Sequence, residues 1–428
     1  MNIVDARKDI RTVRAFAERR AESDPVIEAR VRAIVESVRA EGDEPLTTLT
    51  RQLDCRFIDS LGLRVNEREV TSAYRIVGKD FLSALRLAKR NITAFHRHQM
   101  VRSWEVRTRG VRLGQRFSPL SRVGLYIPGG KAAYPSTVLM NAVPARLAGV
   151  REIVMVTPCN PGGKIAPEVL VAAGECGIRE IYRIGGAQAI AALAYGTESI
   201  RRVEKITGPG NAYVAAAKKL VFGVVGIDMI AGPTEVVIVA DASARPEFIA
   251  ADLIAQAEHD ERAAPIVITT SLQVAEETRA CAGAQMESAP RKAIVWKAFE
   301  GQGMIIVVRS LAEAVELVNL IAPEHVELMV RRPRALAARI VNAGSVFLGT
   351  WSTEALGDYV AGPNHTLPTA GSARFSSPLG VADFMKFTNV IDVSREAFHR
   401  LAPSVEVLAR AEGLYGHAAS VTIRKGRT

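Results

Sequence analysis

The middle of the chain alternates short apolar runs with alanine-rich stretches. The apolar runs predict buried strands over residues 153–156, 181–184, 203–206, 236–239, 266–269 and 305–308. The alanine-rich stretches predict helices between these strands, for example over 187–195 and 212–221. Buried strands that alternate with helices are typical of parallel α/β layers. The pattern therefore predicts an α/β fold with parallel sheets.

The N-terminal part follows a different pattern. Apolar residues at helical spacing predict helical structure over residues 1–45, with a stop at Gly42, and a further helix over 78–100. Residues 104–117 then alternate charged and apolar side chains, which suits a β-hairpin. We therefore expect a helical N-terminal segment and a hairpin before the α/β pattern begins.

The C-terminal residues differ again. A strand is expected over residues 390–393 and a helix over 395–412, with Gly413 as its C-cap. A short compact tail of this kind suits an arm that packs on a partner chain.

Composition narrows the class of protein. Of the 428 residues, 48% are apolar and 23% are charged, which is close to the average for globular proteins and excludes a disordered chain. A chain of this length predicts two to four domains. The four cysteines are widely spaced and form no C-x-x-C pair, so a zinc finger or a disulfide scaffold is not favoured. Without an apolar leader or a long apolar run, the sequence predicts a cytoplasmic protein.

The net charge of +10 could indicate a protein that binds nucleic acid. Basic residues are densest over 86–122, but they are spread through apolar segments without interleaved aromatic residues. A solvated basic face therefore explains them better than a nucleic-acid site. An anionic cofactor or substrate would also favour such a field.

Glycine-rich turns follow three of the predicted strands. They lie at Pro128–Gly130, at 183–188 (RIGGAQ) and at 207–211 (TGPGN). Glycines at strand-to-helix turns let backbone N–H groups approach a phosphate. No turn matches the dinucleotide or P-loop fingerprint, and each alone could be a plain tight turn. Together they favour a nucleotide or a dinucleotide.

A dispersed set of residues offers nitrogen and oxygen ligands. Gln256 and His259 are three residues apart in a helical segment, so both side chains share one face. Asp358 and His417 lie in glycine-flanked polar segments and could complete a site for zinc or a similar ion. The alternative is that these are ordinary structural residues.

A third candidate site is the pair Glu324 and His325, which follows Pro323 at the start of a predicted strand over 326–329. Adjacent carboxylate and imidazole groups offer two proton acceptors of different basicity. A capping glutamate beside a buried histidine is the alternative. His365, in the turn-rich loop AGPNHTLPTAG, adds to a concentration of histidines in the second half of the chain.

The chain resembles the histidinol dehydrogenase family, because it contains the motifs of that family in the same order. These motifs are VGLYIPGGKAAYPSTVLMNA, IGGAQAIAALAYGT, ITGPGNAYVAAAK, AGPTEVVIVAD, QAEHD, APEHVEL, NAGSVFLG, GDYVAGPNHTLPT and AEGLYGH. The resemblance implies oxidation of L-histidinol to L-histidine through a bound aldehyde, the last step of histidine biosynthesis. It also implies two NAD molecules per reaction and one zinc ion per site.

The resemblance assigns a role to each candidate residue. The implied zinc ligands are Gln256, His259, Asp358 and His417. The implied acid/base residues are Glu324 and His325. The implied NAD contacts are Tyr126, Gln188 and Asn211. The implied substrate contacts are Thr234, His365 and Glu412, together with His325 and the zinc ligands. Thr234 stands where many members have serine, so the hydroxyl is retained and a methyl group is added.

The resemblance further implies two incomplete Rossmann-like parallel-sheet domains with small helical N-terminal and C-terminal arms. We expect an arm over 1–25, a zinc- and substrate-bearing domain over 26–125 and 234–378, an NAD-binding domain over 126–233, and a C-terminal arm over 379–428. Members form homodimers with exchanged C-terminal arms, so Glu412 and His417 are expected to complete the partner's site.

Two other functions are kept as alternatives. The same scaffold with zinc and NAD could oxidise another small polar alcohol, such as a sulfonated diol. A basic nucleic-acid-binding protein is the alternative from another class, and it predicts a steep dependence of affinity on salt. The acidic Glu412 and the imidazole of His365 favour a cationic or imidazole-containing substrate.

Overall fold

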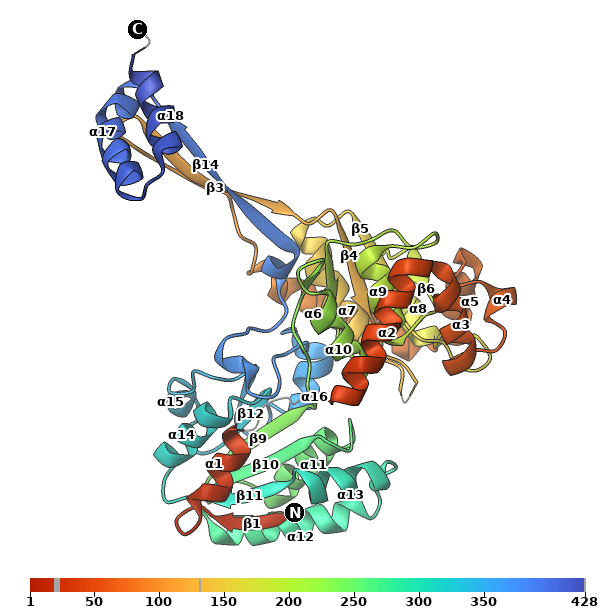
Figure 1. The fold of residues 1–428 in the computed structure, drawn as a ribbon. Helices are drawn as coiled ribbons and strands as arrows, with labels where there is room; N and C mark the ends of the chain where they lie inside the picture. Colours follow the sequence, from red (N-terminus) through yellow and green to blue (C-terminus); the bar gives the residue numbers. More distant parts are fainter. Residues whose placement is uncertain (19–23, 131, 427–428) are drawn as a thin grey trace. The chain divides into compact units, whose positions relative to one another are not determined.

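The computed structural model describes residues 1–18, 24–130 and 132–426. The chain divides into two compact units (Figure 1). The first contains Met1–Gln99 and Leu120–Phe384, and the second contains Met100–Pro119 and Met385–Thr428. Within the described residues, no helix is both long enough and apolar enough to cross a membrane.

Six parallel strands form the larger sheet of the first unit, in the order β1 (Asn2–Asp5), β11 (Met304–Val307), β10 (Ala264–Thr269), β9 (Glu235–Ala240), β12 (His325–Met329) and β13 (Ser345–Leu348). The register pairs His325 with Val236, and Ala264 with Glu235. Every residue of β9, β10 and β12 is buried, as expected for strands covered on both faces. The strands predicted over 236–239, 266–269, 305–308 and 326–329 are thus confirmed.

Two hydrophobic cores lie on opposite faces of this sheet. Along β9, Val237 and Val239 face one core, whereas Val236 and Ile238 face the other, because side chains alternate along a strand. The first core is completed by α1 (Ile10–Glu18) and α14 (Leu311–Ile321). The second is completed by α11 (Pro246–Ala257), α12 (Leu272–Met286) and α13 (Lys292–Gly301).

Five parallel strands form the second sheet, in the order β6 (Glu180–Tyr182), β5 (Glu152–Val156), β4 (Arg122–Tyr126), β7 (Lys205–Thr207) and β8 (Gly226–Ile227). Its helices are α7 (Pro135–Ala148), α8 (Pro167–Glu175), α9 (Gly186–Tyr195) and α10 (Ala212–Val221). The two helices predicted over 187–195 and 212–221 are confirmed. The strand predicted over 203–206 begins later, at Lys205, where it pairs with Val123 of β4. The two helix-covered parallel sheets confirm the predicted fold class.

The N-terminal residues depart from the prediction of helix throughout 1–45. Asn2–Asp5 form the edge strand β1, because the side of β11 away from β10 accepts a parallel partner. Helix α2 (Pro25–Glu41) then ends at Gly42 with a φ of 66°, which confirms the predicted stop. The helices that follow are α3 (Asp43–Leu53), α4 (Ile58–Leu61), α5 (Glu67–Ile76) and α6 (Lys79–Arg97).

The packing of α2 also differs from the expected grouping of residues 26–125 with the zinc-bearing domain. Val31, Val35 and Val38 pack into the core of α9 and α10, beside the five-stranded sheet. The sequence shows an apolar stripe on α2, but two sheets offer apolar surface that could cover it. The alanine-rich surface of α9 is the one that receives it.

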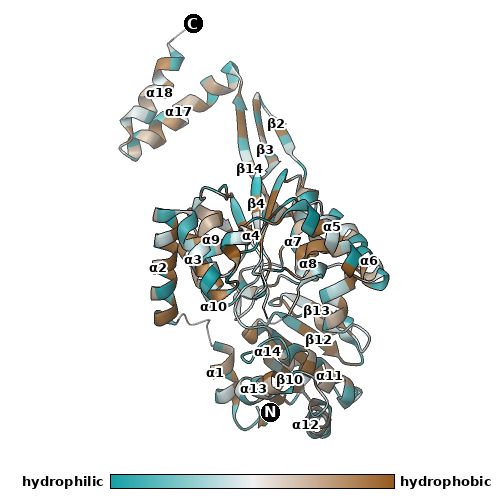
Figure 2. Ribbon diagram, turned by 90° about the vertical axis from the view of Figure 1, so that its right-hand side faces the viewer, coloured by the Kyte–Doolittle hydropathy of each residue, from teal (hydrophilic) through white to brown (hydrophobic). Residues whose placement is uncertain are grey.

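The second unit combines an antiparallel sheet with two helices. The sheet order is β14 (Met385–Val393), β3 (Val111–Pro119) and β2 (Trp104–Thr108), which confirms the predicted hairpin. Strand β14 is longer than predicted because it pairs with the whole length of β3. Helix α17 (Arg395–Ala411) confirms the predicted helix, and Gly413 follows it with a φ of 75°. Helix α18 (Tyr415–Lys425) completes the unit. Figure 2 shows apolar and polar residues interspersed along both helices.

Candidate active site

A cavity of about 480 Å³ lies in the first unit, between the edges of its two sheets. Tyr126 at the end of β4 and the turn Gly208–Asn211 after β7 come from the carboxyl edge of the five-stranded sheet. Thr234 before β9 and His325 at the start of β12 come from the amino edge of the six-stranded sheet. The predicted site residues that line this cavity are Tyr126, Asn211, Thr234, His259, Glu324, His325, Asp358 and His365.

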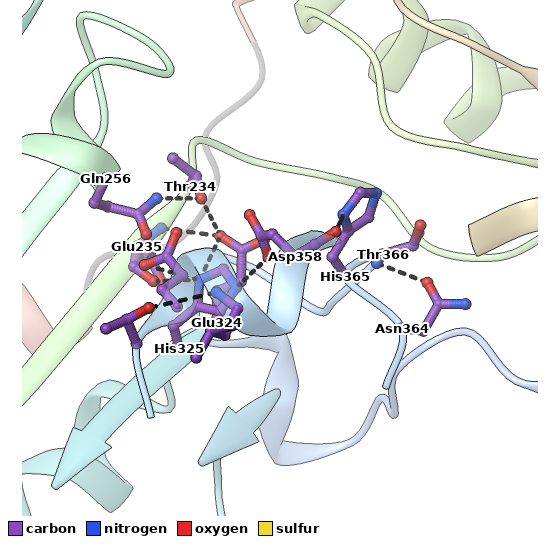
Figure 3. A network of polar contacts seen from close by, with 12 residues as sticks. Thr234, Glu235, Gln256, Glu324, His325, Asp358, Asn364, His365 and Thr366 are labelled. Carbon is purple, nitrogen blue, oxygen red and sulfur yellow. Dashed lines mark hydrogen bonds and ion pairs between the residues drawn. The ribbon is translucent and has the colours of Figure 1, made fainter. Parts of the chain in front are cut away.

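Glu324 is held by two hydrogen bonds at the start of β9. The Thr234 hydroxyl donates to its carboxylate, and the backbone N–H of Glu235 donates to Oε2 at 3.0 Å (Figure 3). The sharp turn that aims Glu324 here follows Ala322, which ends α14 in the left-handed conformation with a φ of 51°. Burial raises the pKa of the Glu324 carboxyl, although His325 and the two hydrogen bonds act in the opposite direction.

His325 lies among three carboxylates. Its Nδ1 lies 3.2 Å from the Glu235 carbonyl oxygen, 3.7 Å from Glu324 Oε2 and 3.8 Å from Glu354 Oε2. Its Nε2 lies 3.7 Å from Asp358 Oδ1. Burial alone would lower the pKa of His325, but the charges of Glu354 and Glu324 and the contact with Asp358 raise it well above its ordinary value.

Three side chains beside His325 lie close enough together to hold a metal ion. One potential ligand atom each from His259, Glu354 and Asp358 lies within 4.8 Å of the other two. Gln256 lies between Thr234 and Glu354: its Nε2 donates to the Thr234 hydroxyl, and its amide oxygen faces the Glu354 carboxylate. Gln256 lies in the last turn of α11, whereas His259 lies beyond the end of that helix at Ala257. Both residues reach the same cluster, but the expected helix does not extend to His259.

Sequence reasoning missed Glu354. The residue lies in α16 (Glu354–Leu356), and Asp358 lies in the π-helical turn Gly357–Ala361 that continues it. The four-residue spacing of the two carboxylates was the available signal, because such residues share one helix face. Only 3% of Glu354 is exposed, and burial raises its pKa to about 8. Its backbone N–H donates to Glu327 Oε1 at 2.7 Å.

His365 connects two parts of the cavity wall. Its Nδ1 lies 2.9 Å from the carbonyl oxygen of Asp358, and its Nε2 lies 3.3 Å from the hydroxyl of Thr137 on α7. The neighbouring Asn364 accepts from Thr366 N–H at 2.9 Å and donates to the Met140 carbonyl at 2.6 Å, which fixes the loop. The ring therefore has a protein partner at each nitrogen.

The residues assigned to NAD surround the glycine-rich turns. The Tyr126 hydroxyl accepts from the backbone N–H of Gly186 at 3.1 Å. Asn211 caps α10 and accepts from the N–H groups of Tyr213 and Val214 at 3.0 and 3.2 Å. Gln188 is only 2% exposed on α9, and among the described residues it is not one that lines the cavity.

Glu412 and His417 belong to the second unit. Glu412 is the C-cap of α17 and His417 lies in the first turn of α18, and both are exposed. Their predicted contribution to a partner's site stays a prediction.

Comparison with known proteins shows the family of the chain. The family described as histidinol dehydrogenase matches residues 17–425. A histidinol dehydrogenase of Synechococcus is 51% identical over 409 residues, covering 95% of this chain and 94% of the relative. One from Rhodopseudomonas palustris is 52% identical over 412 residues, covering 96% of this chain and 95% of the relative.

A crystal structure of histidinol dehydrogenase from Elizabethkingia anophelis has the same fold. It superimposes with a TM-score of 0.92 at 37% identity, covering 99% of this chain and 97% of that chain. Together with the full-length sequence matches, this similarity shows that the chain belongs to the histidinol dehydrogenase family of oxidoreductases.

Proposed function

We propose that the protein oxidises L-histidinol to L-histidine through L-histidinaldehyde, with two NAD molecules and one zinc ion per site, as the last step of histidine biosynthesis. The observation that carries the proposal is that the Glu324–His325 pair lines one cavity with His259 and Asp358, which form a cluster with the adjoining Glu354. A cytoplasmic location is part of the same proposal.

The residues present fit a divalent metal ion. The carboxylates of Glu324, Glu354 and Asp358 lie around His325, so the cluster carries more negative than positive charge when they are ionised. A divalent cation held by Gln256, His259 and Asp358 would offset that charge, and imidazole and oxygen ligands suit zinc. The same cation would oppose the effect of the carboxylates on His325 and lower the pKa of its imidazole.

The residues around the glycine-rich turns fit a dinucleotide. Gly208 approaches β4 so closely that a Cβ atom there would lie 2.0 Å from the carbonyl oxygen of Tyr126. Gly130, with a φ of 94°, has open space where a Cβ would stand. Gly130 keeps the backbone accessible to a bound group, as phosphate-binding turns require, whereas Gly208 lets the turn pack closely against β4. Tyr126 and Asn211 would contact the NAD at these turns.

When bound, zinc would fix the amino and alcohol groups of the substrate, and each NAD would accept a hydride. With its pKa lowered by the cation, His325 is suited to take the alcohol proton at Nε2, because the Glu235 carbonyl, 3.2 Å from Nδ1, would accept the hydrogen of that nitrogen. Glu324 is suited to activate the water that adds to the aldehyde. The overall reaction then consumes one water and releases three protons with the two NADH.

Several contacts remain for the substrate. Thr234 offers a hydroxyl beside Glu324, and His365 lines the same cavity. Glu412 would complement the imidazole ring of histidinol, because a carboxylate accepts from a ring N–H. A bound aldehyde would be protected from release in a closed site.

In this proposal, Glu412 and His417 come from the partner subunit of a homodimer with exchanged C-terminal arms. A dimer that combines one Asp358→Ala chain with one His417→Ala chain would then contain one intact site. Mixing the two inactive variants should restore activity, and continued inactivity of the mixed dimer would refute the shared site.

The proposed reaction is tested by mixing the purified protein with L-histidinol and NAD and following NADH by absorbance. The assay is run after metal removal and again after zinc is restored, with histidine quantified in parallel. Zinc-dependent formation of two NADH per histidine is the expected result. No reaction with zinc present would contradict the proposal, and small polar diols would be the next substrates to screen.

A further inference from the structure

A lysine occupies the buried face of α10, directly after the glycine-rich turn Thr207–Asn211. The buried residues of this helix are Val214, Ala217, Lys218 and Val221, so Lys218 stands in an otherwise apolar stripe. Its Nζ forms an ion pair with Asp228, and the two side chains are only 2% and 1% exposed. A buried ion pair needs further hydrogen bonds to offset the desolvation of its charges.

Two of those further hydrogen bonds involve Gly208 of the turn. Lys218 Nζ donates to the carbonyl oxygen of Gly208 at 3.0 Å. Asp228 Oδ2 accepts from the N–H of Gly208 at 2.7 Å, and Oδ1 accepts from the N–H of Met229 at 2.6 Å. The ion pair therefore holds Gly208 by both of its backbone polar groups.

Gly208 is the residue whose position matters most in this turn. Its φ of 116° is open to glycine and strained for other residues. Its α-carbon packs against the carbonyl of Tyr126, and Asn211 begins α10 three residues later. The ion pair thus holds the residue that contacts Tyr126 and leads to Asn211, and both of these residues line the same cavity.

We propose that Lys218 and Asp228 are positioning residues for the dinucleotide, which hold the turn Gly208–Asn211 in its binding conformation before the cofactor arrives. The inference rests on the proposed function, because it takes NAD as the occupant of the turn. Without the ion pair, Gly208 would sample other conformations. Binding of NAD would then have to order the turn, and this would make the free energy of NAD binding less favourable.

The test replaces the pair by apolar side chains in Lys218→Met/Asp228→Leu, which leaves no buried charge unpaired. Lys219→Met is the matched control, because Lys219 is the next residue and forms an exposed ion pair with Glu28 at 2.9 Å. Isothermal titration calorimetry on the zinc-loaded protein measures the Kd of NAD and, separately, of L-histidinol. We expect the double variant to raise the Kd of NAD at least about tenfold, with the Kd of L-histidinol and the bound zinc unchanged. The control should match the wild type.

Each other outcome overturns a defined claim. An unchanged Kd of NAD in the double variant refutes the positioning role, while the proposed function stands. Equal losses of NAD and L-histidinol binding show a general structural role and also refute it. If the wild-type protein binds no NAD, the proposed function fails and the inference fails with it.

If the double variant does not fold, hydrogen exchange on the wild-type protein tests whether the turn is ordered before NAD binds. The Gly208 amide is expected to exchange slowly in the cofactor-free protein, because the Asp228 carboxylate accepts its hydrogen. Exchange as fast as that of an unprotected amide would refute preorganisation of the turn.

Discussion

Replacing Glu354 by glutamine should stabilise the metal-free protein and weaken its metal site. The carboxyl group of Glu354 is buried, and its pKa rises from an ordinary 4.5 to about 8 in the folded chain. Between these two values the folded state binds the proton that the unfolded state releases. Stability is therefore unaffected by this group below pH 4.5 and falls as the pH rises toward 8.

The two pKa values set the size of the effect. Linkage gives a destabilisation of roughly 1 kcal/mol at pH 5, which grows to roughly 4 kcal/mol at pH 8. Glu354→Gln removes the titrating group and should recover most of that difference. The same change removes a charge that helps to hold the cation beside His259 and Asp358, so zinc affinity should fall.

Urea unfolding of metal-free wild type and Glu354→Gln at pH 5 and pH 8 measures the effect. The matched control is Glu300→Gln, an exposed glutamate at the end of α13. The free energy of unfolding of Glu354→Gln should exceed that of wild type by far more at pH 8 than at pH 5. The control should show no such difference between the two pH values. An equal change at both pH values would refute the assignment of a buried, proton-binding carboxyl to Glu354.

Three further predictions concern the site and the turn. His259→Asn should lose bound zinc and activity together, by at least about 100-fold; metal analysis with the NADH assay checks this, and an active variant with full zinc would contradict it. Glu324→Gln should slow oxidation of the aldehyde about 10²–10⁴-fold and affect alcohol oxidation much less; single-turnover assays on histidinol and on histidinaldehyde distinguish the two, and equal losses would refute the division of roles. Gly208→Ala should destabilise the protein by roughly 1–3 kcal/mol, because its Cβ meets the Tyr126 carbonyl; urea unfolding with wild-type stability would refute the close approach.

Local patterns in the sequence predicted much of the fold. The buried strands of the six-stranded sheet, the helices α9 and α10 and the stop at Gly42 all follow from apolar periodicity and glycine placement. The errors occurred where the outcome depended on a distant partner. Asn2–Asp5 form a strand because the edge of β11 accepts a parallel partner. Helix α2 packs against α9 because α9 presents an alanine-rich surface.

The sequence by itself determined the chemical groups that are close along the chain, such as the adjacent Glu324 and His325 and the nearby Gln256 and His259. Tertiary structure alone decided that Glu354 meets this cluster and that Lys218 meets Asp228. Periodicity specifies which face of an element is apolar or polar, because that depends only on local geometry. Which faces meet depends on the order of strands in each sheet, and so on the free energy of packing the whole chain.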